Sequence, residues 1–297
     1  MSASYVIVVD STTDIPPNKA EEWGLEVIPY IFTMDGKEYY NHLDYRDLPV
    51  KDFYNNLRAG KMASTTLVTS SRYMEAWEPH LKEGKDVLYM CLSSMLSKSY
   101  EQSVLAAKEA AEAYPERKVI TIDTKSASVG QGLLGYYASK ARNEGKSLEE
   151  NASYLTNDII PRLHHWVMAD DLQHMRRGGR VSGAQAFFGT MLSVKPILAI
   201  LPDGKLVPLH KARGRNKALE FFMEQMDKYG FSDRNQTVFI AHSDIPELAQ
   251  QLKTMITAKY GVKDFLMNEI GPVIGAHTGP GTIALIYVGD KPRPQGN

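Results

Sequence analysis

Short apolar runs alternate with longer amphipathic segments in the first half of the chain. Four runs have the length and aliphatic character of buried strands: 5–9, 26–32, 87–92 and 119–122. Three other segments carry apolar residues at helical spacing: 71–84, 99–114 and 128–145. Because strands that alternate with helices form parallel sheets, this half is predicted to be a mainly parallel sheet covered by helices on both faces.

The second half has a different rhythm. The turn Leu201-Pro-Asp-Gly204 separates the apolar runs 194–200 and 205–209 and predicts an antiparallel hairpin. Further predicted elements are helices at about 215–229 and 246–260 and strands near 237–241, 265–268 and 282–288. We therefore predict an α/β protein of two closely packed domains: a three-layer α/β/α domain over residues 1–160, and a two-layer α/β domain with a mixed sheet over residues 161–297.

Composition excludes several classes of partner. Lys and Arg number 34 and Asp and Glu 35, so the net charge of −1 gives no attraction to nucleic acid or to an anionic membrane. No stretch approaches the roughly 20 apolar residues of a membrane helix, and the first residues lack the pattern of a secretory signal. The single cysteine, Cys91, lies in an apolar run, which favours a buried thiol in a reducing compartment. We expect a cytoplasmic protein without stable membrane insertion.

Polar residues concentrate in four predicted loops beside the apolar runs: 10–14, 63–66, 93–99 and 275–281. The carboxyl ends of strands in an open α/β sheet form the binding crevice, so these distant stretches could meet there. Ser97 or Ser99 stands where the next helix should begin, and one such serine is explained by capping. The remaining hydroxyls fit a carboxylate or phosphate bound at a helix N-terminus. His277, in a segment predicted to be a loop, has a structural role or donates a hydrogen bond to the same anion.

Motifs for other chemistries are absent from the sequence. It contains neither a Gly-rich nucleotide motif nor a Cys/His cluster with metal-ligand spacing, so no cofactor or metal is expected. A hydrolase or phosphotransferase that uses Ser94 and His277 on an acyl or phosphate ester is the alternative, although no Gly-x-Ser-x-Gly elbow follows a strand. The basic segments 176–180 and 211–217 are solvated turns or docking surfaces.

Several motifs in this order resemble the DegV family of fatty-acid-binding proteins, which includes the FakB subunits of bacterial fatty acid kinase. The motifs are Val8-Val-Asp-Ser-Thr-Thr-Asp-Ile-Pro16, Ser93-Ser-Met-Leu-Ser-Lys-Ser-Tyr100, Gly178-Gly-Arg-Val-Ser182, Lys195-Pro-Ile-Leu198, Asp203-Gly-Lys-Leu206 and His277-Thr-Gly-Pro-Gly281. Together they cover nearly the whole chain.

The resemblance implies a two-domain α/β carrier that is not itself an enzyme. It would bind a long-chain fatty acid of about 16 to 18 carbons in a buried apolar channel, where each buried methylene contributes about 0.8 kcal/mol. Thr65 and Ser97 would hold the carboxylate, with Ser94 and His277 close to it. Further head-group candidates are Thr66, Ser93 and Thr278. The carrier would present the carboxylate to a separate ATP-dependent fatty acid kinase subunit, for which Arg180 and Arg213 are candidate docking residues.

Two segments depart from the family pattern at the expected head group. Thr65-Thr-Leu-Val-Thr69 replaces Thr-Ser-Gln-Pro-Ser, and Leu96-Ser-Lys-Ser99 replaces Leu-Ser-Gly-Thr. The first change removes a rigid turn, and Lys98 places a bulky cation where glycine is usual. We therefore expect the loop shape or the preferred ligand to differ from the family pattern.

Overall fold

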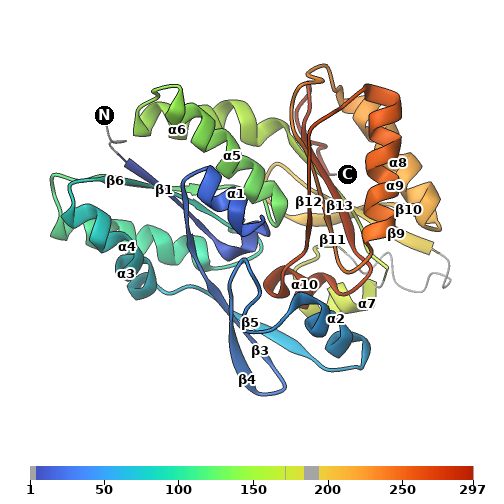
Figure 1. The fold of residues 1–297 in the computed structure, drawn as a ribbon, viewed down its shortest axis with the longest axis horizontal. Coiled ribbons are helices and arrows are strands. Elements are labelled where there is room, and N and C mark those ends of the chain that lie inside the picture. Colours follow the sequence, from blue (N-terminus) through green and yellow to red (C-terminus); the bar gives the residue numbers. More distant parts are fainter. Residues whose placement is uncertain (1–4, 171, 184–193, 297) are drawn as a thin grey trace.

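The computed structural model describes residues 5–170, 172–183 and 194–296, which form three sheets with helices between and around them (Figure 1). Within these residues no helix is long and apolar enough to cross a membrane. The prediction of an α/β fold with one parallel and one mixed sheet is confirmed.

The first sheet contains four parallel strands in the order β2-β1-β6-β7. Their bounds are β1 (Tyr5–Asp10), β2 (Leu25–Ile28), β6 (Asp86–Cys91) and β7 (Val119–Asp123). One face packs on α3 (Ser70–Lys82) and α4 (Ser99–Ala113), and the other on α1 (Pro17–Glu22), α5 (Val129–Asn143) and α6 (Leu148–Tyr154). Successive strand residues enter different cores: Val8 packs with α3 and α4, whereas Ile7 and Val9 pack with α5. This explains why the strands are apolar on both faces.

A second, antiparallel sheet is one that the sequence pattern does not predict. Its order is β4-β3-β5, with β3 (Tyr30–Met34), β4 (Lys37–Asn41) and β5 (Ala63–Thr66), and α2 (Val50–Arg58) lies beside it (Figure 1). The prediction of a single strand over 26–32 is wrong, because Pro29 has no N–H for a ladder and the chain leaves the first sheet there. Residues 63–66, predicted as a polar loop, pair with β3 instead.

The third sheet is mixed and has the strand order β10-β9-β8-β13-β11-β12. Its strands are β8 (Leu163–Met168), β9 (Val194–Ile200), β10 (Leu206–Arg213), β11 (Val238–His242), β12 (Phe265–Glu269) and β13 (Ile283–Val288). The predicted hairpin is the antiparallel pair β9 and β10, and only β11 and β12 run parallel within the described sheet. Helices α8 (Arg215–Tyr229) and α9 (Pro246–Tyr260) cover its outer face.

Two short helices, α7 (Leu172–Gly178) and α10 (Pro272–Thr278), lie near the small second sheet (Figure 1). Helix α10 packs against β5, β3 and α2, so a late part of the chain reaches back to elements of the first half. Strands of the first two sheets precede residue 160 and those of the third follow it. The domain boundary near residue 160 stays a prediction.

The Asp10–Asp14 stretch joins the two halves through buried hydrogen bonds. The buried Asp10 carboxylate accepts hydrogen bonds from Gln131 and Tyr89, at 3.1 and 2.9 Å. Asp14 accepts from the Ser128 hydroxyl at 2.6 Å and from the Gly271 N–H, beyond β12, at 2.9 Å. Burial raises the pKa of Asp14 to about 8. The hydrogen bonds of both carboxyl groups are therefore made within the protein, and their role is structural.

Helix α5 lies between the first and third sheets and shares one core with both. The helix comes close to the third sheet at Gly130, where an added Cβ would lie 2.2 Å from Nε2 of His165 on β8 and 2.6 Å from the Ser126 Oγ. That ring is buried and hydrogen-bonded to Ser126 at 2.7 Å. Glycine at this position is what allows the helix to approach β8.

We predict that Gly130→Ala destabilises the protein, because the new methyl group displaces a buried, hydrogen-bonded ring. Overpacking of this kind costs about 1–3 kcal/mol, which should exceed the roughly 1 kcal/mol that alanine contributes within a helix. The free energy of unfolding from urea denaturation measures the effect. Gly135→Ala in the same helix is the control, since its Cβ would meet only the flexible end of Leu25, at 2.8 Å, and should cost less. A Gly130→Ala protein as stable as wild type would contradict this packing.

Candidate functional site

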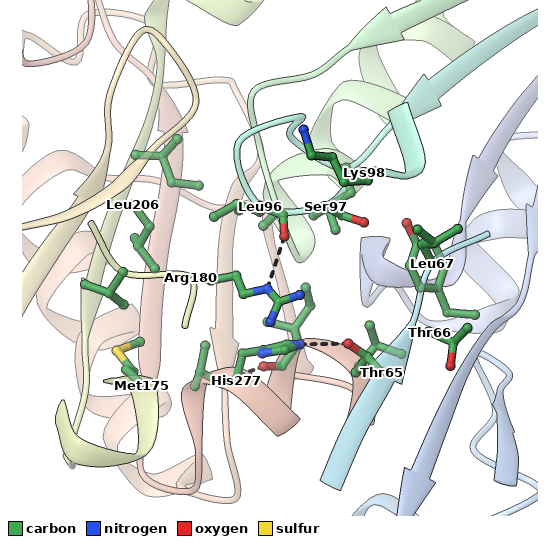
Figure 2. A pocket seen from close by; sticks show the side chains of 18 residues that line it. Thr65, Thr66, Leu67, Leu96, Ser97, Lys98, Met175, Arg180, Leu206 and His277 are labelled. Carbon is green, nitrogen blue, oxygen red and sulfur yellow. Dashed lines mark hydrogen bonds between the residues drawn. The ribbon is translucent and has the colours of Figure 1, made fainter. Parts of the chain in front are cut away.

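A largely apolar cavity of about 220 Å³, the inner cavity, lies between the two halves of the chain (Figure 2). The first half contributes Tyr30, Thr65, Thr66, Leu67, Leu92, Leu96, Ser97, Lys98 and Ala127. The second half contributes Met175, Arg180, Val181, Ile200, Leu206, Val273, Ile274, His277 and Thr278. The lining includes three basic side chains and neither Asp nor Glu. Its chemistry therefore fits a ligand with an apolar body and an anionic head.

Thr65 on β5 and His277 on α10 meet at the polar end of this cavity (Figure 2). The Thr65 Oγ1 lies 2.8 Å from the His277 Nε2, and the His277 Nδ1 lies 3.1 Å from the Gly178 carbonyl oxygen. A carbonyl oxygen only accepts, so Nδ1 carries the proton. In the neutral ring Nε2 is then the acceptor, and Thr65 donates its hydroxyl proton to it.

The His277 ring is held in a neutral state by its surroundings. Burial lowers the pKa of His277 to about 4, and the nearby positive charge of Arg180 acts in the same direction. The carbonyl of Gly178 opposes this shift. An anion placed beside the ring would favour its charged form.

Gly178 at the end of α7 allows this contact. An added Cβ there would lie 2.9 Å from both the Cα and the carbonyl oxygen of His277. Because these are backbone atoms, the two helices would have to separate. The Gly-Gly-Arg segment therefore has a packing role, and His277 lies within α10 and not in the predicted loop.

The serines that follow β6 make different contacts, and only Ser97 among them lines the inner cavity. Ser97 lines the inner cavity, accepts a hydrogen bond from the Ser99 N–H at 3.2 Å and donates to the Ser99 Oγ at 3.0 Å. Helix α4 begins at Ser99 with Lys98 at its N-cap and without a side-chain cap, so capping by Ser97 or Ser99 in the usual position is wrong. The Ser99 hydroxyl accepts instead from the N–H of Val68 at 3.2 Å.

Ser93 and Ser94 lie outside the lining of the inner cavity, contrary to expectation. The Ser93 hydroxyl is buried and donates to the Gly204 carbonyl at 2.9 Å, which fixes the β9–β10 turn against the first half. The Ser94 hydroxyl donates to the Asp123 carboxylate at 2.6 Å. Both side chains stabilise the loop.

The remaining candidates divide between the cavity wall and the surface. Thr66 and Thr278 line the inner cavity. Arg180 also lines it, with its Nε 3.3 Å from the Leu96 carbonyl and its Nη1 2.8 Å from that of Gly178 (Figure 2). Arg213 lies on β10, exposed and outside the lining.

Sequence reasoning missed Tyr30. Its hydroxyl is buried, belongs to a residue of the cavity wall, and lies near the hydroxyls of Ser97 and Ser99 without a hydrogen bond of good geometry to either. Burial raises the pKa of Tyr30 well above its usual value, so the phenol keeps its proton. An isolated tyrosine in an apolar run carries no signal that could have identified it.

A second hollow of about 170 Å³, the outer chamber, borders the same polar end. Thr65, Arg180 and His277 line both spaces, and the outer chamber adds polar residues such as Ser64, His174 and Arg177. Ser64, Arg177 and Arg180 are exposed, so the chamber opens to solvent. The shared residues therefore form a wall between an apolar interior and a polar entrance.

A model of the family described as "Uncharacterised protein, DegV family" matches residues 4–290. The chain belongs to the DegV family. The DegV domain-containing protein CPE0026 of Clostridium perfringens is 41% identical over 290 residues, which cover 98% of this chain and 99% of that protein.

Solved structures of DegV proteins share the fold. A DegV family protein from Thermus thermophilus, described for its fatty acid binding, is 28% identical with a TM-score of 0.86 over 96% of this chain and 99% of that one. The fatty acid kinase B3 protein of Streptococcus pneumoniae, solved with linoleic acid, has a TM-score of 0.84 at 19% identity over 97% and 100% of the two chains. At that identity the second likeness shows the fold alone.

We predict that His277 makes the stability of the protein depend on pH. Its pKa in the folded protein is about 4, below the value of about 6.5 in an unfolded chain, so stability is full above pH 6.5 and is lost as pH falls towards 4. The loss attributable to this ring is at most about 3 kcal/mol. Other buried histidines titrate as well, so the measurement compares wild type with His277→Gln by urea denaturation between pH 7 and pH 4. Equal losses in both proteins would show that His277 is not held neutral.

Proposed function

We propose that the protein binds a long-chain fatty acid, with the tail in the inner cavity and the carboxylate beside Thr65, Ser97 and His277. The observation that carries this proposal is one apolar cavity whose polar end has hydroxyls, an arginine and a histidine but no acidic side chain. The fatty acid binding described for the Thermus thermophilus relative supports it.

The tail supplies the affinity. At about 0.8 kcal/mol per methylene, a chain of roughly 16 carbons gains on the order of 12 kcal/mol before ordering costs are subtracted. The cavity volume of about 220 Å³ is smaller than most ligand pockets, which span roughly 300–1,000 Å³. Side chains of the wall must therefore move to admit a long tail, and Met175 is a flexible one.

The head group requires donors that replace the water around a carboxylate. Among the described residues, the Tyr30 hydroxyl makes no hydrogen bond of good geometry, and the Nη2 of Arg180 has no hydrogen-bond partner. Hydrogen bonds from a guanidinium to a carboxylate are stronger than those between neutral groups. Arg180 is thus a head-group candidate, and not only the docking residue that the sequence suggested.

The fatty acid would be presented to a separate kinase. A carboxylate oxygen would attack the γ-phosphorus of ATP, and the bond from that phosphorus to ADP would break, giving an acyl phosphate and ADP. The motif resemblance and the absence of a nucleotide-binding motif in the sequence support a carrier without catalytic activity of its own. Arg213, exposed on β10, is the remaining candidate for docking.

A hydrolase is the second candidate, favoured by the distance of 2.8 Å between Thr65 Oγ1 and His277 Nε2, which suits a nucleophile and its base. The base is oriented here by a backbone carbonyl and not by a carboxylate. Ser94, the nucleophile considered from the sequence, is hydrogen-bonded to Asp123 instead. Turnover of a long-chain ester that is lost in Thr65→Ala would favour the hydrolase over the carrier.

We predict that Thr65→Ala and Ser97→Ala each weaken fatty acid binding by about 1–3 kcal/mol, or roughly 5- to 150-fold in Kd, because the buried carboxylate loses a hydrogen bond. Titration of delipidated protein with palmitate measures the change. Organic extraction of untreated wild-type protein, followed by mass spectrometry, should also release a fatty acid.

Ser94→Ala is the matched control, since it removes a hydroxyl from the same loop but outside the cavity wall. Its affinity for palmitate should equal that of wild type. Unchanged affinity in both Thr65→Ala and Ser97→Ala would reject their roles. Absence of saturable binding to wild type, together with an extract free of acyl species, would reject the proposed function.

We further predict that one proton is taken up when a fatty acid binds near neutral pH. The Thr65 hydroxyl can donate to the carboxylate and keep its hydrogen bond to His277 only if Nε2 gains a proton and becomes the donor, and the negative ligand raises the His277 pKa from its value of about 4. Affinity should fall as pH rises, by up to about tenfold per unit. Calorimetry in buffers of different ionisation enthalpy counts the protons, and His277→Gln should remove the uptake. A proton count of zero in wild type would contradict this coupling.

A further inference from the structure

The buried side chain of Asp14 attaches the start of α10 to the first half of the chain, outside the linings of both the inner cavity and the outer chamber. Its Oδ1 accepts a hydrogen bond from the N–H of Gly271, the residue before α10, at 2.9 Å, and its Oδ2 accepts from the Ser128 hydroxyl at 2.6 Å. The Asp14 carbonyl oxygen accepts from Asn268 Nδ2 at 2.8 Å. Because α10 carries His277 and other residues of the cavity wall, these contacts also position that wall.

A second buried oxygen beside Asp14 lacks a hydrogen-bond donor. The side chain of Asn41, which is 2% exposed, donates through Nδ2 to the carbonyl oxygen and the hydroxyl oxygen of Ser11, at 3.3 and 3.0 Å. A carbonyl oxygen only accepts, so Nδ2 is fixed towards Ser11, and Asn41 Oδ1 has no hydrogen-bond partner among the described residues. An added Cβ on Gly271 would lie 2.6 Å from Asp14 Oδ1 and 3.4 Å from Asn41 Oδ1, so the two acceptor oxygens face the same point.

The groups around Asp14 do not neutralise a negative charge. Its titratable neighbours are Asp10 on β1, Tyr45 in the loop after β4, Tyr54 on α2 and Glu269 on β12. Arg58, also on α2, forms an ion pair with Asp244 at 2.5 Å. Burial is the main cause that raises the pKa of Asp14 to about 8, and it outweighs the two hydrogen bonds that favour the ionised form. A proton on this carboxyl would remove the buried charge and supply the donor that Asn41 lacks.

We propose that Asp14 keeps a proton at neutral pH, donates it to Asn41 Oδ1, and thereby forms a pH-sensitive contact that holds the start of α10 against the first half. Loss of the proton would leave a buried charge beside a second bare acceptor oxygen. That charge can regain water only if the segment around Gly271 moves away from the first half. The inference concerns the free protein and does not depend on fatty acid binding.

Urea denaturation of wild type and Asp14→Asn between pH 5 and pH 9 tests the proton, because the variant is neutral at every pH. The pKa of Asp14 is about 8 in the folded protein and about 3.9 in an unfolded chain, so the stability that this group contributes is full below pH 3.9 and is lost as pH rises to 8. The unfolding constant of wild type relative to Asp14→Asn should therefore rise by up to about tenfold per pH unit between pH 5 and pH 8, and level off above pH 8.

Ser128→Ala is the matched control, since it removes a hydrogen bond from the same carboxyl group but leaves its proton in place. This variant should keep the pH dependence of wild type. Infrared spectroscopy observes the proton directly: a carboxylic acid C=O band should disappear between pH 7 and pH 9 in wild type and be absent from Asp14→Asn. Asn41→Ala should lower the midpoint of this titration, because the neutral carboxyl loses its acceptor.

Hydrogen exchange locates the opening. The ratio of exchange rates of α10 amides, wild type over Asp14→Asn, should increase at least fivefold from pH 6 to pH 9, and comparison at equal pH removes the intrinsic pH dependence of exchange. Amides of α8, on the outer face of the third sheet, should show no such increase.

Three results would overturn the inference. A ratio of unfolding constants that is constant between pH 5 and pH 8 would show that Asp14 is ionised in the folded protein. An unchanged infrared midpoint in Asn41→Ala would reject Asn41 as the acceptor. A ratio of α10 exchange rates that does not change with pH would reject the coupling to this helix. Binding of palmitate is measured separately, so none of these results decides the proposed function.

Discussion

The hydrogen bond between Thr65 and His277 is the contact on which the proposed site depends. It joins β5, from the small sheet of the first half, to α10, from the second half, and so closes the polar end of the inner cavity. The Gly178 carbonyl determines which group donates in this hydrogen bond, because it holds the ring proton of His277 on Nδ1 and leaves Nε2 as the acceptor. The approach of α7 that provides this carbonyl requires glycine at that position. The hydrogen-bonding state of His277 at the head group thus depends on the close packing of α7 and α10.

Buried hydrogen bonds and the packing of α5, all outside the inner cavity, hold the two halves together. Asp14 accepts a hydrogen bond from a backbone N–H beyond β12, Ser93 binds the turn between β9 and β10, and α5 fills the space between two sheets. Asp14 and Ser93 are buried, so breaking either hydrogen bond leaves an unsatisfied polar group. These contacts hold the backbones of the two halves in place around the cavity, while side chains of its wall can still move.

Affinity and orientation come from different parts of the site. Apolar residues from both halves form the cavity wall, and affinity arises because a hydrocarbon tail that packs against them leaves water. The charged side chains lie at one end of the cavity and orient the ligand. The lack of acidic side chains in both linings gives that end a preference for anions without a permanent salt bridge. A neutral histidine between two arginine-lined spaces can then respond to the charge of whatever binds.

The sequence by itself determined many of the local elements and the family, although not the sheet of β3, β4 and β5. Alternating apolar runs located the strands of the parallel sheet, the Leu201–Gly204 turn located a hairpin, and α8 and α9 begin and end where their periodicity predicts. Only the tertiary structure decided which polar residues share a cavity. Ser94 and Ser97 are three residues apart, yet one binds Asp123 and the other lines the cavity, and Tyr30 enters the wall without any motif. The spacing of apolar residues indicates which face of a helix or strand is buried, because the residues of one face recur at a fixed interval along the chain. The direction of a loop side chain depends on partners that are distant in sequence.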